Sequence, residues 1–240
     1  MKIRNWEGVA LIIGSGDIGR SIYEFLSIRA PMLDVFICGR NLNNNKNSIH
    51  LDLENENSFT SFENQVELLN KPLRLVINTS GFLHSSLVKP EKRLSHINRS
   101  SIIKNFSINA IAPILIAKSI EKFIRTDSPF SFASLSARVG SIGDNRLGGW
   151  YSYRASKAAQ NQLLKTLSIE WRRKYPLSIV SILHPGTCDT KLSKPFQTGL
   201  PMGQLFTPSQ SCEYLINIIA DQEPSDSGKF LAWDRSIISW

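Results

Sequence analysis

The sequence predicts an α/β protein with a doubly wound parallel sheet and helices on both faces. Short apolar runs alternate along the chain with longer segments of helical periodicity, as they do when each strand is followed by a crossover helix. Right-handed crossovers leave few topologies for such a chain and favour the doubly wound one. A glycine-rich turn directly after the first apolar run fits the same arrangement.

The predicted elements follow in order from the amino terminus. Buried strands are predicted at residues 9–13, 34–38, 73–78, 130–134 and 179–183. Helices are predicted at residues 18–28, 58–69, 102–124 and 152–174. Residues 41–47 read as a polar loop. Residues 185–208 contain Pro and Gly without clear periodicity, which is typical of a lid or substrate loop.

The bulk composition predicts one globular domain. The chain has 240 residues, enough for one sizeable core. Hydrophobic residues make up 42% and charged residues 20%, which is ordinary for a globular protein. No repeat, low-complexity tract or linker divides the sequence. We therefore expect a single domain over residues 1–240, with a substrate loop near residues 186–208.

The formal net charge of +8 is compatible with nucleic acid, an anionic membrane surface or a phosphorylated cofactor as partner. The basic residues are scattered. The densest clusters are residues 89–93 and 172–174, and the second lies at a predicted helix C-terminus, where the dipole favours cations. We favour the cofactor and expect no nucleic-acid partner. The alternative, a nucleic-acid-binding module, predicts steeply salt-dependent binding.

The three cysteines Cys38, Cys188 and Cys212 lie far apart and show no metal-ligand spacing. An odd number also argues against a disulfide framework. We expect idle thiols and no metal site.

The apolar run at residues 9–13 follows Lys2 and Arg4 and superficially resembles a secretory signal. It is short, however, and leads into Gly14 without a small-residue cleavage site. No apolar run approaches the roughly 20 residues that span a bilayer. We expect a cytoplasmic protein with no membrane partner.

The first strand is joined to the first helix by a G-x-G-x-x-G pattern, made of Gly14, Ser15, Gly16, Asp17, Ile18 and Gly19. In this setting Gly14 permits a tight turn, Gly16 lets the backbone approach a pyrophosphate, and Gly19 allows close packing of helix and strand. The helix N-terminus offers N–H groups to the phosphates. Asp17 is unexpected there, and we expect its carboxylate to face solvent. The pattern predicts a Rossmann-type nucleotide site, with a bare structural turn as the alternative.

Arg40 follows the second strand, where a NAD-preferring site usually has an acidic residue for the ribose 2′-hydroxyl. A guanidinium can pair with a 2′-phosphate through two hydrogen bonds. The sequence therefore predicts NADP(H) rather than NAD, with a ligand-free surface arginine as the alternative. Asp52, farther on, is expected either near the adenine ring or as a loop or cap residue.

Tyr153 and Lys157 lie four residues apart in a predicted helix, so both side chains fall on one face. A phenol beside an ammonium is expected to have a lowered pKa and to act as proton donor and acceptor. The alternative is a half-buried tyrosine next to a snorkelling lysine. Taken with the nucleotide turn, the pair indicates a nicotinamide-dependent oxidoreductase.

With both ends in view, the chain resembles the short-chain dehydrogenase/reductase (SDR) family over essentially its whole length. Residues 78–81, Asn-Thr-Ser-Gly, stand where that family has an Asn-rich motif that steadies the sheet and lines the adenosine side. The resemblance implies four catalytic residues: Asn109, Ser136, Tyr153 and Lys157. It also implies cofactor contacts beyond the glycine-rich turn from Asn78, Ser80, Gly81, Tyr153, Lys157, Pro185, Gly186, Thr187, Cys188 and Thr190.

Residues 135–141, 144–151, 194–196 and 233–240 resemble a narrower group, the C-factor-like branch, which is named after a bacterial cell–cell signalling protein. The chain departs from the family pattern at two places. Its glycine-rich turn is one residue shorter, with Asp17 where a glycine is common. Ser136 lies farther before Tyr153 than is usual, because residues 144–150 look like an insertion, and Ser134 is the alternative serine.

The resemblance implies a division of labour in carbonyl reduction. Tyr153 would protonate the carbonyl oxygen, and Lys157 would lower the tyrosine pKa and hold the nicotinamide ribose. Ser136 would hydrogen-bond the substrate oxygen, and Asn109 would support a water that connects Lys157 to solvent. We expect homodimers or homotetramers formed through the helices at residues 102–124 and 152–174.

The expected function is thus NADP-dependent reduction of a carbonyl, or oxidation of the alcohol, of a small apolar substrate. The alternative is a non-catalytic NADP-binding sensor or cell–cell signalling protein. Which residues line the substrate-binding part of the cleft stays open. Trp150 and Tyr151 either line the cleft or fill core, and His84 is expected in a packing or surface role. The hydrophobic loop residues either form an apolar pocket or pack inward: Phe196, Leu200 and Met202.

Overall fold

Seven parallel strands form the central sheet in the computed structural model, which describes residues 3–40, 42 and 46–240. Their spatial order is β3-β2-β1-β4-β5-β6-β9, so the order reverses between β1 and β4. The doubly wound, Rossmann-type prediction is confirmed. The strands span Gly8–Ile13 (β1), Leu33–Gly39 (β2), Ser48–His50 (β3), Leu73–Asn78 (β4), Phe130–Leu135 (β5), Ser178–His184 (β6) and Phe230–Ala232 (β9).

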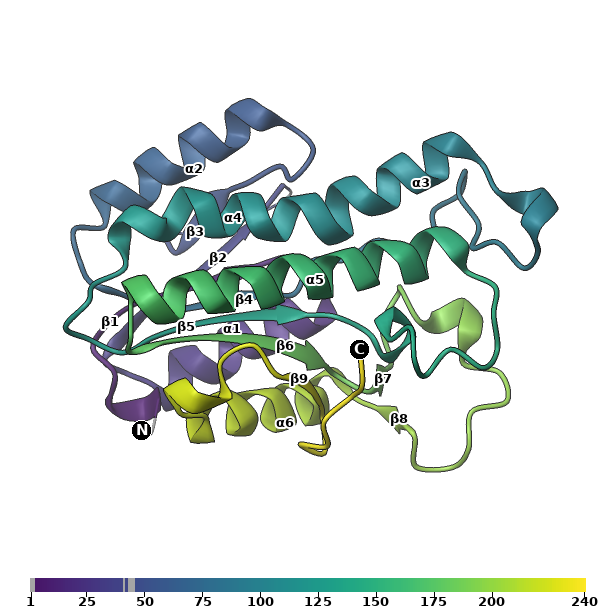
Figure 1. The fold of residues 1–240 in the computed structure, drawn as a ribbon. Helices are drawn as coiled ribbons and strands as arrows, with labels where there is room; N and C mark the ends of the chain where they lie inside the picture. The colour runs from purple at the N-terminus through teal and green to yellow at the C-terminus, as the bar shows by residue number, and fades with distance from the viewer. Residues whose placement is uncertain (1–2, 41, 43–45) are drawn as a thin grey trace.

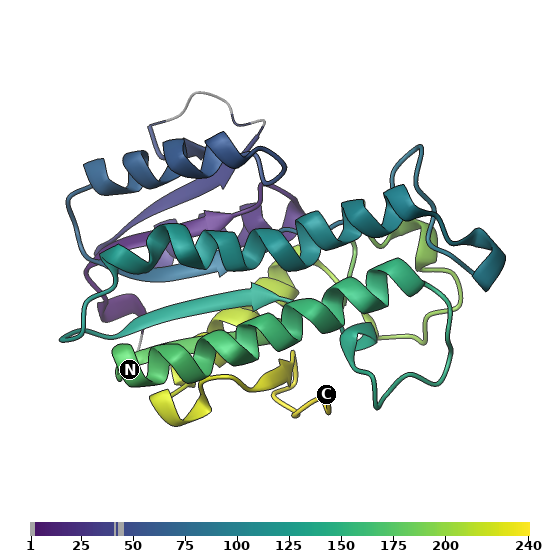
Figure 2. The same cartoon turned by 45° about the horizontal axis from the view of Figure 1, so that its top comes forward.

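Helices cover both faces of the sheet, as Figures 1 and 2 show. On one face α2, α4 and α5 lie side by side, and α3 continues the line of α4 along α5; on the other face α1 packs against α6. The helices span Asp17–Arg29 (α1), Glu56–Leu68 (α2), Arg99–Phe106 (α3), Ala112–Ile120 (α4), Tyr151–Lys174 (α5) and Pro208–Asp221 (α6).

Two hydrophobic layers sandwich the sheet because side chains alternate along each strand. In β1, Val9 and Leu11 pack into the layer beneath α2, α4 and α5, whereas Ala10 and Ile12 pack into the layer beneath α1 and α6. All six residues of β1 are buried. The unbroken apolar run that predicts this strand is what a parallel strand covered on both faces requires.

The five predicted strands agree with β1, β2, β4, β5 and β6 to within one residue at each end. The prediction missed β3, β9 and α6, together with the short pair Thr187–Cys188 (β7) and Leu205–Phe206 (β8) inside the predicted substrate loop. The missed strands have two or three residues each, too few to show a period. Of the predicted polar loop 41–47, residues 41 and 43–45 lie outside the described residues.

The helix predicted at residues 102–124 is present as one helical stretch, Arg99–Phe123, but it is not α-helical throughout. α3 passes into a π-helical turn, Ser107–Ile111 (η3), then into α4, and ends in the 3-10 turn Glu121–Phe123 (η4). Pro113 in the first turn of α4 lacks the N–H that a regular helix would direct to the carbonyl of Asn109. A local change in the hydrogen-bond pattern at this point follows from that missing donor.

By length and mean hydropathy alone, the helical stretch Arg99–Phe123 could also cross a bilayer, since it has 25 residues and its most apolar 18-residue window has a mean hydropathy of 1.3. Half of its most apolar window is buried inside the protein, as in a core helix of a soluble protein. Ser and Asn residues interrupt its apolar runs, so no unbroken apolar segment marks this stretch in the sequence. It is weak evidence for a membrane span.

Candidate active site

A cleft of about 610 Å³ opens at the carboxyl ends of the strands, where the strand order reverses between β1 and β4. Six strands of the central sheet, β1 to β6, are each followed by residues that line it. This is where doubly wound sheets bind ligands, and the volume suits one. Among the lining residues are Gly14, Gly39, Arg40, Ser80, Gly81, Ser136, Tyr153, Lys157, Pro185 and Thr190.

The glycine-rich turn forms one wall of the cleft. Gly14 has a φ of 103°, and its N–H donates to the carbonyl of Cys38 at 2.8 Å. A Cβ on Gly19 would lie 2.0 Å from the carbonyl oxygen of Gly14, so a side chain there is excluded. A Cβ on Gly16 would meet nothing within 4 Å, because this residue faces open space at the start of α1. The turn therefore fits the pyrophosphate of a dinucleotide.

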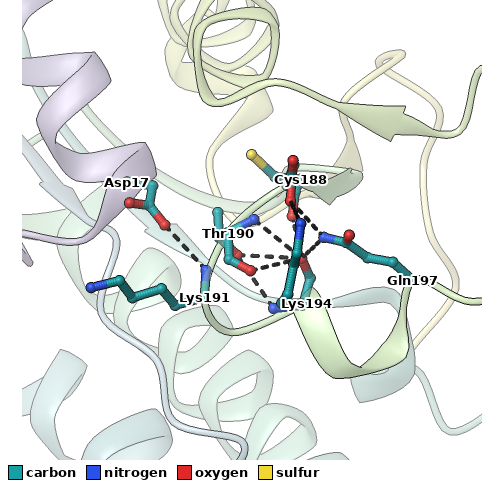
Figure 3. A network of polar contacts seen from close by, with 8 residues as sticks. Asp17, Cys188, Thr190, Lys191, Lys194 and Gln197 are labelled. Carbon is teal, nitrogen blue, oxygen red and sulfur yellow. Dashed lines mark hydrogen bonds and ion pairs between the residues drawn. The ribbon is translucent and has the colours of Figure 1, made fainter.

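Asp17 connects this turn with the loop after β7. Its Oδ2 accepts a hydrogen bond from the backbone N–H of Lys191 at 3.2 Å, as Figure 3 shows. Asp17 is partly exposed, and its carboxylate has in addition a partner 174 residues away in the chain, which the sequence did not predict. Asp17, Thr190 and Lys191 all line the cleft, so the contact joins its two sides.

Arg40 lines the cleft with its side chain 59% exposed. Its Nη1 lies 3.5 Å from Glu54 Oε2, and Lys104 Nζ also contacts the Glu54 carboxylate at 2.5 Å. Asp52 lines the same part of the cleft, and its Oδ1 accepts from the N–H of Glu54 at 3.1 Å. No motif in the sequence marks Glu54 as a site residue. An anionic group placed beside Arg40 would meet two cations, Arg40 and Lys104, and two carboxylates, Asp52 and Glu54.

Ser136 follows β5 and lies on the cleft wall, 4% exposed. Its hydroxyl donates to Asn161 Oδ1 at 2.6 Å. The alternative serine, Ser134, is fully buried and accepts hydrogen bonds from Asn78 Nδ2 and Gln160 Nε2. Of the two serines, Ser136 alone is among the lining residues.

Tyr153 and Lys157 also line the cleft, from the first turns of α5. Burial raises the pKa of the Tyr153 phenol above its ordinary value and lowers the pKa of Lys157 to about 7. Lys157 Nζ donates to the carbonyl of Leu135 and to Gln160 Oε1, both at 2.9 Å. The lowered pKa expected for Tyr153 is therefore wrong for the chain alone, because desolvation of the phenolate dominates.

Asn109 lies in the π-helical turn, fully buried behind the cleft rather than on its wall. Its Oδ1 accepts from the N–H of Phe82 at 2.7 Å, and its Nδ2 donates to the Phe82 carbonyl at 2.8 Å. Nδ2 also lies 2.9 Å from Ser156 Oγ on α5. The amide thus fixes the loop after β4 to the helix that carries Tyr153.

The remaining predicted cofactor residues divide into two groups. Gly14 to Gly19, Arg40, Asp52, Ser80, Gly81, Pro185 and Thr190 line the cleft. The residues that are not among the lining residues are Asn78, Gly186, Thr187 and Cys188. Asn78 is fully buried, and its Oδ1 accepts from the N–H and the hydroxyl of Ser80. Asn78 therefore supports Ser80, which lines the cleft.

An aromatic cluster, made of Trp150, Phe196 and His84, adjoins Tyr153. The Phe196 ring lies 4.8 Å from the Trp150 ring and 5.5 Å from the His84 ring, and Trp150 lies 6.1 Å from Tyr153. His84 Nε2 is 3.1 Å from the carbonyl of Leu192. Tyr151 and Met202 are exposed instead. Of the loop hydrophobes, Phe196 packs inward from its 3-10 turn, Lys194–Phe196 (η6).

Three of the buried polar residues that support the site were not predicted: Glu91, Gln160 and Asn161. The Glu91 carboxylate accepts from the N–H and the hydroxyl of Ser152 and thereby caps α5 one residue before Tyr153. Gln160 and Asn161 lie three and four residues after Lys157. That helical spacing was the available signal, whereas Glu91 carries no local one.

Known proteins agree with this geometry. The family model described as short chain dehydrogenase matches residues 37–200. The chain belongs to the short-chain dehydrogenase family. C-signal from Myxococcus xanthus is 28% identical over 148 residues, which are 61% of this chain and 83% of that protein. This similarity agrees with the C-factor-like branch that the sequence resembles.

One further protein is similar to this chain in sequence, and another is similar in structure. The 1-hydroxy-2-glutathionyl-2-methyl-3-butene dehydrogenase of Rhodococcus sp. strain AD45 is 31% identical over 141 residues, which are 58% of each chain. The NADPH-bound carbonyl reductase from chicken fatty liver superposes with a TM-score of 0.83 at 22% identity, with 100% of both chains covered. This structural likeness shows the fold. The family is one of oxidoreductases that use small-molecule substrates.

Proposed function

We infer that the protein is an NADP(H)-dependent carbonyl reductase that acts on a small apolar carbonyl compound, or on the alcohol in the reverse direction. The observation that carries this inference is the convergence of Ser136, Tyr153 and Lys157 on the cleft that the glycine-rich turn lines. A proton donor, a cation and a hydrogen-bond donor beside a dinucleotide seat are what hydride transfer to a carbonyl requires.

The cofactor, when bound, supplies the hydride. The first turn of α1 and Gly16 would hold its pyrophosphate, and Arg40 would pair with a 2′-phosphate. Lys157 would hold the nicotinamide ribose hydroxyls. The carbonyl reductase from chicken fatty liver shares this fold and holds NADPH in its crystal structure, which supports this assignment.

Tyr153 would donate its proton to the carbonyl oxygen. Because burial raises its pKa, the phenol is protonated throughout the neutral range and can serve as an acid. The Lys157 ammonium would stabilise the phenolate that forms, and Ser136 would hydrogen-bond the same substrate oxygen. Asn109 would keep the loop after β4 and α5 in register.

The substrate side favours apolar molecules. Trp150 and Phe196 present aromatic surface next to Tyr153, and such surfaces bind apolar groups by burial and edge-to-face contact. We expect aliphatic or aromatic aldehydes and ketones to react faster than charged ones.

Oxidation of NADPH, followed by its absorbance, with a panel of aldehydes and ketones tests the function. Tyr153→Phe should abolish turnover and leave the NADPH dissociation constant nearly unchanged. Tyr151→Phe is the matched control, because Tyr151 lies two residues away on the same helix and is 42% exposed. A Tyr153→Phe protein with wild-type turnover would exclude the mechanism.

A second candidate function is a cofactor-binding signalling protein, which the similarity to C-signal favours. It predicts NADPH binding without oxidation across the whole panel. The four proposed catalytic residues argue for the enzyme, since binding alone does not need all of them.

We further infer a single cytoplasmic domain that forms homodimers or homotetramers. Exposed apolar residues on the long helices, Ile103, Ile111 and Ile169, support the oligomer. Light scattering of the eluted protein gives its mass directly, and a monomer at all concentrations would reject this part.

A further inference from the structure

A buried amide follows Lys157 on the inner face of α5. Gln160 lies three residues after the lysine, so the two side chains share one helix face. Gln160 is 0% exposed and Lys157 is 2% exposed. A fully buried glutamine needs partners for its carbonyl oxygen and for its amide hydrogens.

Two of these partners, Lys157 and Leu135, line the cleft, and the third, Ser134, is buried next to Leu135 on β5. Gln160 Oε1 accepts from Lys157 Nζ at 2.9 Å, while Nε2 donates to Ser134 Oγ at 2.8 Å and to the Leu135 carbonyl at 3.2 Å. An ammonium only donates, so it takes the oxygen end of the amide and leaves the nitrogen end for β5. Lys157 and Gln160 therefore fix each other's orientation.

Ser134 continues this network to the next strand. Asn78 Nδ2 donates to Ser134 Oγ at 2.9 Å, and Asn78 Oδ1 accepts from Ser80 Oγ at 2.6 Å. Ser80 lines the cleft. A buried chain of hydrogen bonds thus joins Lys157 on α5, across β5 and β4, to the loop at the proposed cofactor seat.

The Lys157 ammonium is buried without an opposite charge in contact. Within residues 3–40, 42 and 46–240, its hydrogen-bond acceptors are the Leu135 carbonyl and Gln160 Oε1. Burial lowers its pKa to about 7. Other titratable groups among the described residues surround α5, but none of them is bonded to Lys157. Tyr153 lies on α5 itself, and Asp17 and Asp52 line the cleft. The segments packed against α5 contribute Glu91, Arg99, Lys104, Lys118, Arg138 and His184.

We propose that Gln160 is the positioning residue of Lys157, whose ammonium it keeps charged and aimed so that one of three N–H donors stays free for the cofactor ribose. The proposal rests on the proposed function in one respect, since the ribose is a partner only if the cofactor binds. The hydrogen bond itself belongs to the chain alone. Its loss should make the buried ammonium harder to keep charged.

Two substitutions at residue 160 should move the Lys157 titration in opposite directions. Gln160→Leu removes the acceptor, and the pKa of Lys157 should fall by about one unit. Gln160→Glu puts a carboxylate there, and the pKa should rise by about one unit or more. The ¹³Cε chemical shift of Lys157 in cofactor-free protein reports the titration, with Lys157→Met to assign the signal.

The pH dependence of turnover gives a second measurement of the Lys157 titration. The high-pH limb of kcat for reduction should move to lower pH in Gln160→Leu and to higher pH in Gln160→Glu, because the charged lysine is the active form. Gln162 is exposed on the same helix, so Gln162→Leu and Gln162→Glu should leave both readings at the wild-type values.

A space-filling role for Gln160 predicts a different result: both variants lose thermal stability, and the Lys157 titration stays where it is. That result would overturn the proposal. Gln160→Met has the same chain length without the oxygen and replaces the leucine variant if the latter does not fold. A wild-type protein that never oxidises NADPH would reject the proposed function, while the NMR titration would still decide the role of Gln160.

Discussion

The Ser136 hydroxyl donates its single proton to Asn161 Oδ1 at 2.6 Å, so in the cofactor-free chain it is already engaged inside the protein. Asn161 is 2% exposed and sits one helical turn after Lys157. To hydrogen-bond a substrate oxygen, Ser136 must turn its proton away from this acceptor. The strength of the resting hydrogen bond therefore sets how readily the serine serves the substrate.

Asn161→Asp should lower kcat by about tenfold or more. A charged acceptor holds a proton more tightly than a neutral one, by about 1 kcal/mol, and its charge opposes the negative charge that develops on the substrate oxygen. Single-turnover rates with NADPH measure the effect. Gln162→Glu, the same chemical change at the exposed neighbouring position, should react at the wild-type rate. Equal rates for both variants would show that Asn161 does not govern Ser136.

Two alanine substitutions in the glycine-rich turn should separate folding from binding. Gly19→Ala forces a Cβ to within 2.0 Å of the Gly14 carbonyl oxygen, and we expect a loss of several kcal/mol in the free energy of unfolding. Gly16→Ala has room, so its stability should stay within about 1 kcal/mol of wild type, but its methyl group should weaken NADPH binding at least tenfold. Urea unfolding and NADPH fluorescence titration provide the two readings. Similar losses of stability in both variants would contradict the packing argument.

Arg40→Ala should weaken NADPH binding by about ten- to a hundredfold and NADH binding by less than threefold, because a guanidinium–phosphate pair is lost only with the phosphorylated cofactor. Calorimetric titration with each cofactor gives the ratio. Arg29→Ala, at the exposed end of α1, should change neither affinity. Equal losses for the two cofactors would reject the 2′-phosphate assignment.

Lys157→Met should change how stability depends on pH. The pKa of Lys157 falls from 10.5 to about 7 on folding, which at 1.36 kcal/mol per unit costs about 5 kcal/mol below pH 7. Above pH 7 the folded protein holds the lysine neutral while the unfolded chain still binds the proton, so this cost disappears as the pH rises towards 10.5.

The stability of Lys157→Met relative to wild type should therefore decrease by roughly 3 kcal/mol between about pH 7 and pH 9.5. The Gln160 oxygen, which loses its donor, adds a constant penalty to the variant that does not affect the slope, while the Leu135 carbonyl keeps its hydrogen bond from Gln160 Nε2. Urea unfolding across this range measures the difference. Lys118→Met, at an exposed site on α4, serves as the control and should follow the wild-type curve. A pH-independent difference for Lys157→Met would mean that the lysine is solvated.

Much of the sheet could be predicted because its strands are buried on both faces. Residues 9–13 and 73–78 read as strands from apolar character alone, and both are buried in the structure. The π-helical turn could not be predicted, since Ser107–Ile111 has the same periodicity as the helices beside it. β3 and β9 are too short to carry a pattern.

The same distinction holds at the site. Tyr153 and Lys157 could be found by their spacing, because a helix brings residues four apart together. The contact between Asp17 and Lys191 joins distant segments and leaves no local trace. Glu54 meets Arg40 only because β3 brings its loop there. Because glutamine side chains are seldom fully buried, the residue type alone predicts an exposed position for Gln160.

The π-helical turn at Ser107–Ile111 holds one residue more than an α-helical turn, since its backbone hydrogen bonds join residues five apart. A one-residue deletion inside this turn would close it to regular α-helix and leave α4 in phase with α3, so Ile116 and Ile120 would stay buried. The same deletion inside α4 would instead rotate the residues after it by about 100°. A protein shortened at the π turn would therefore keep its core and lose the backbone bulge that carries Asn109 to Phe82.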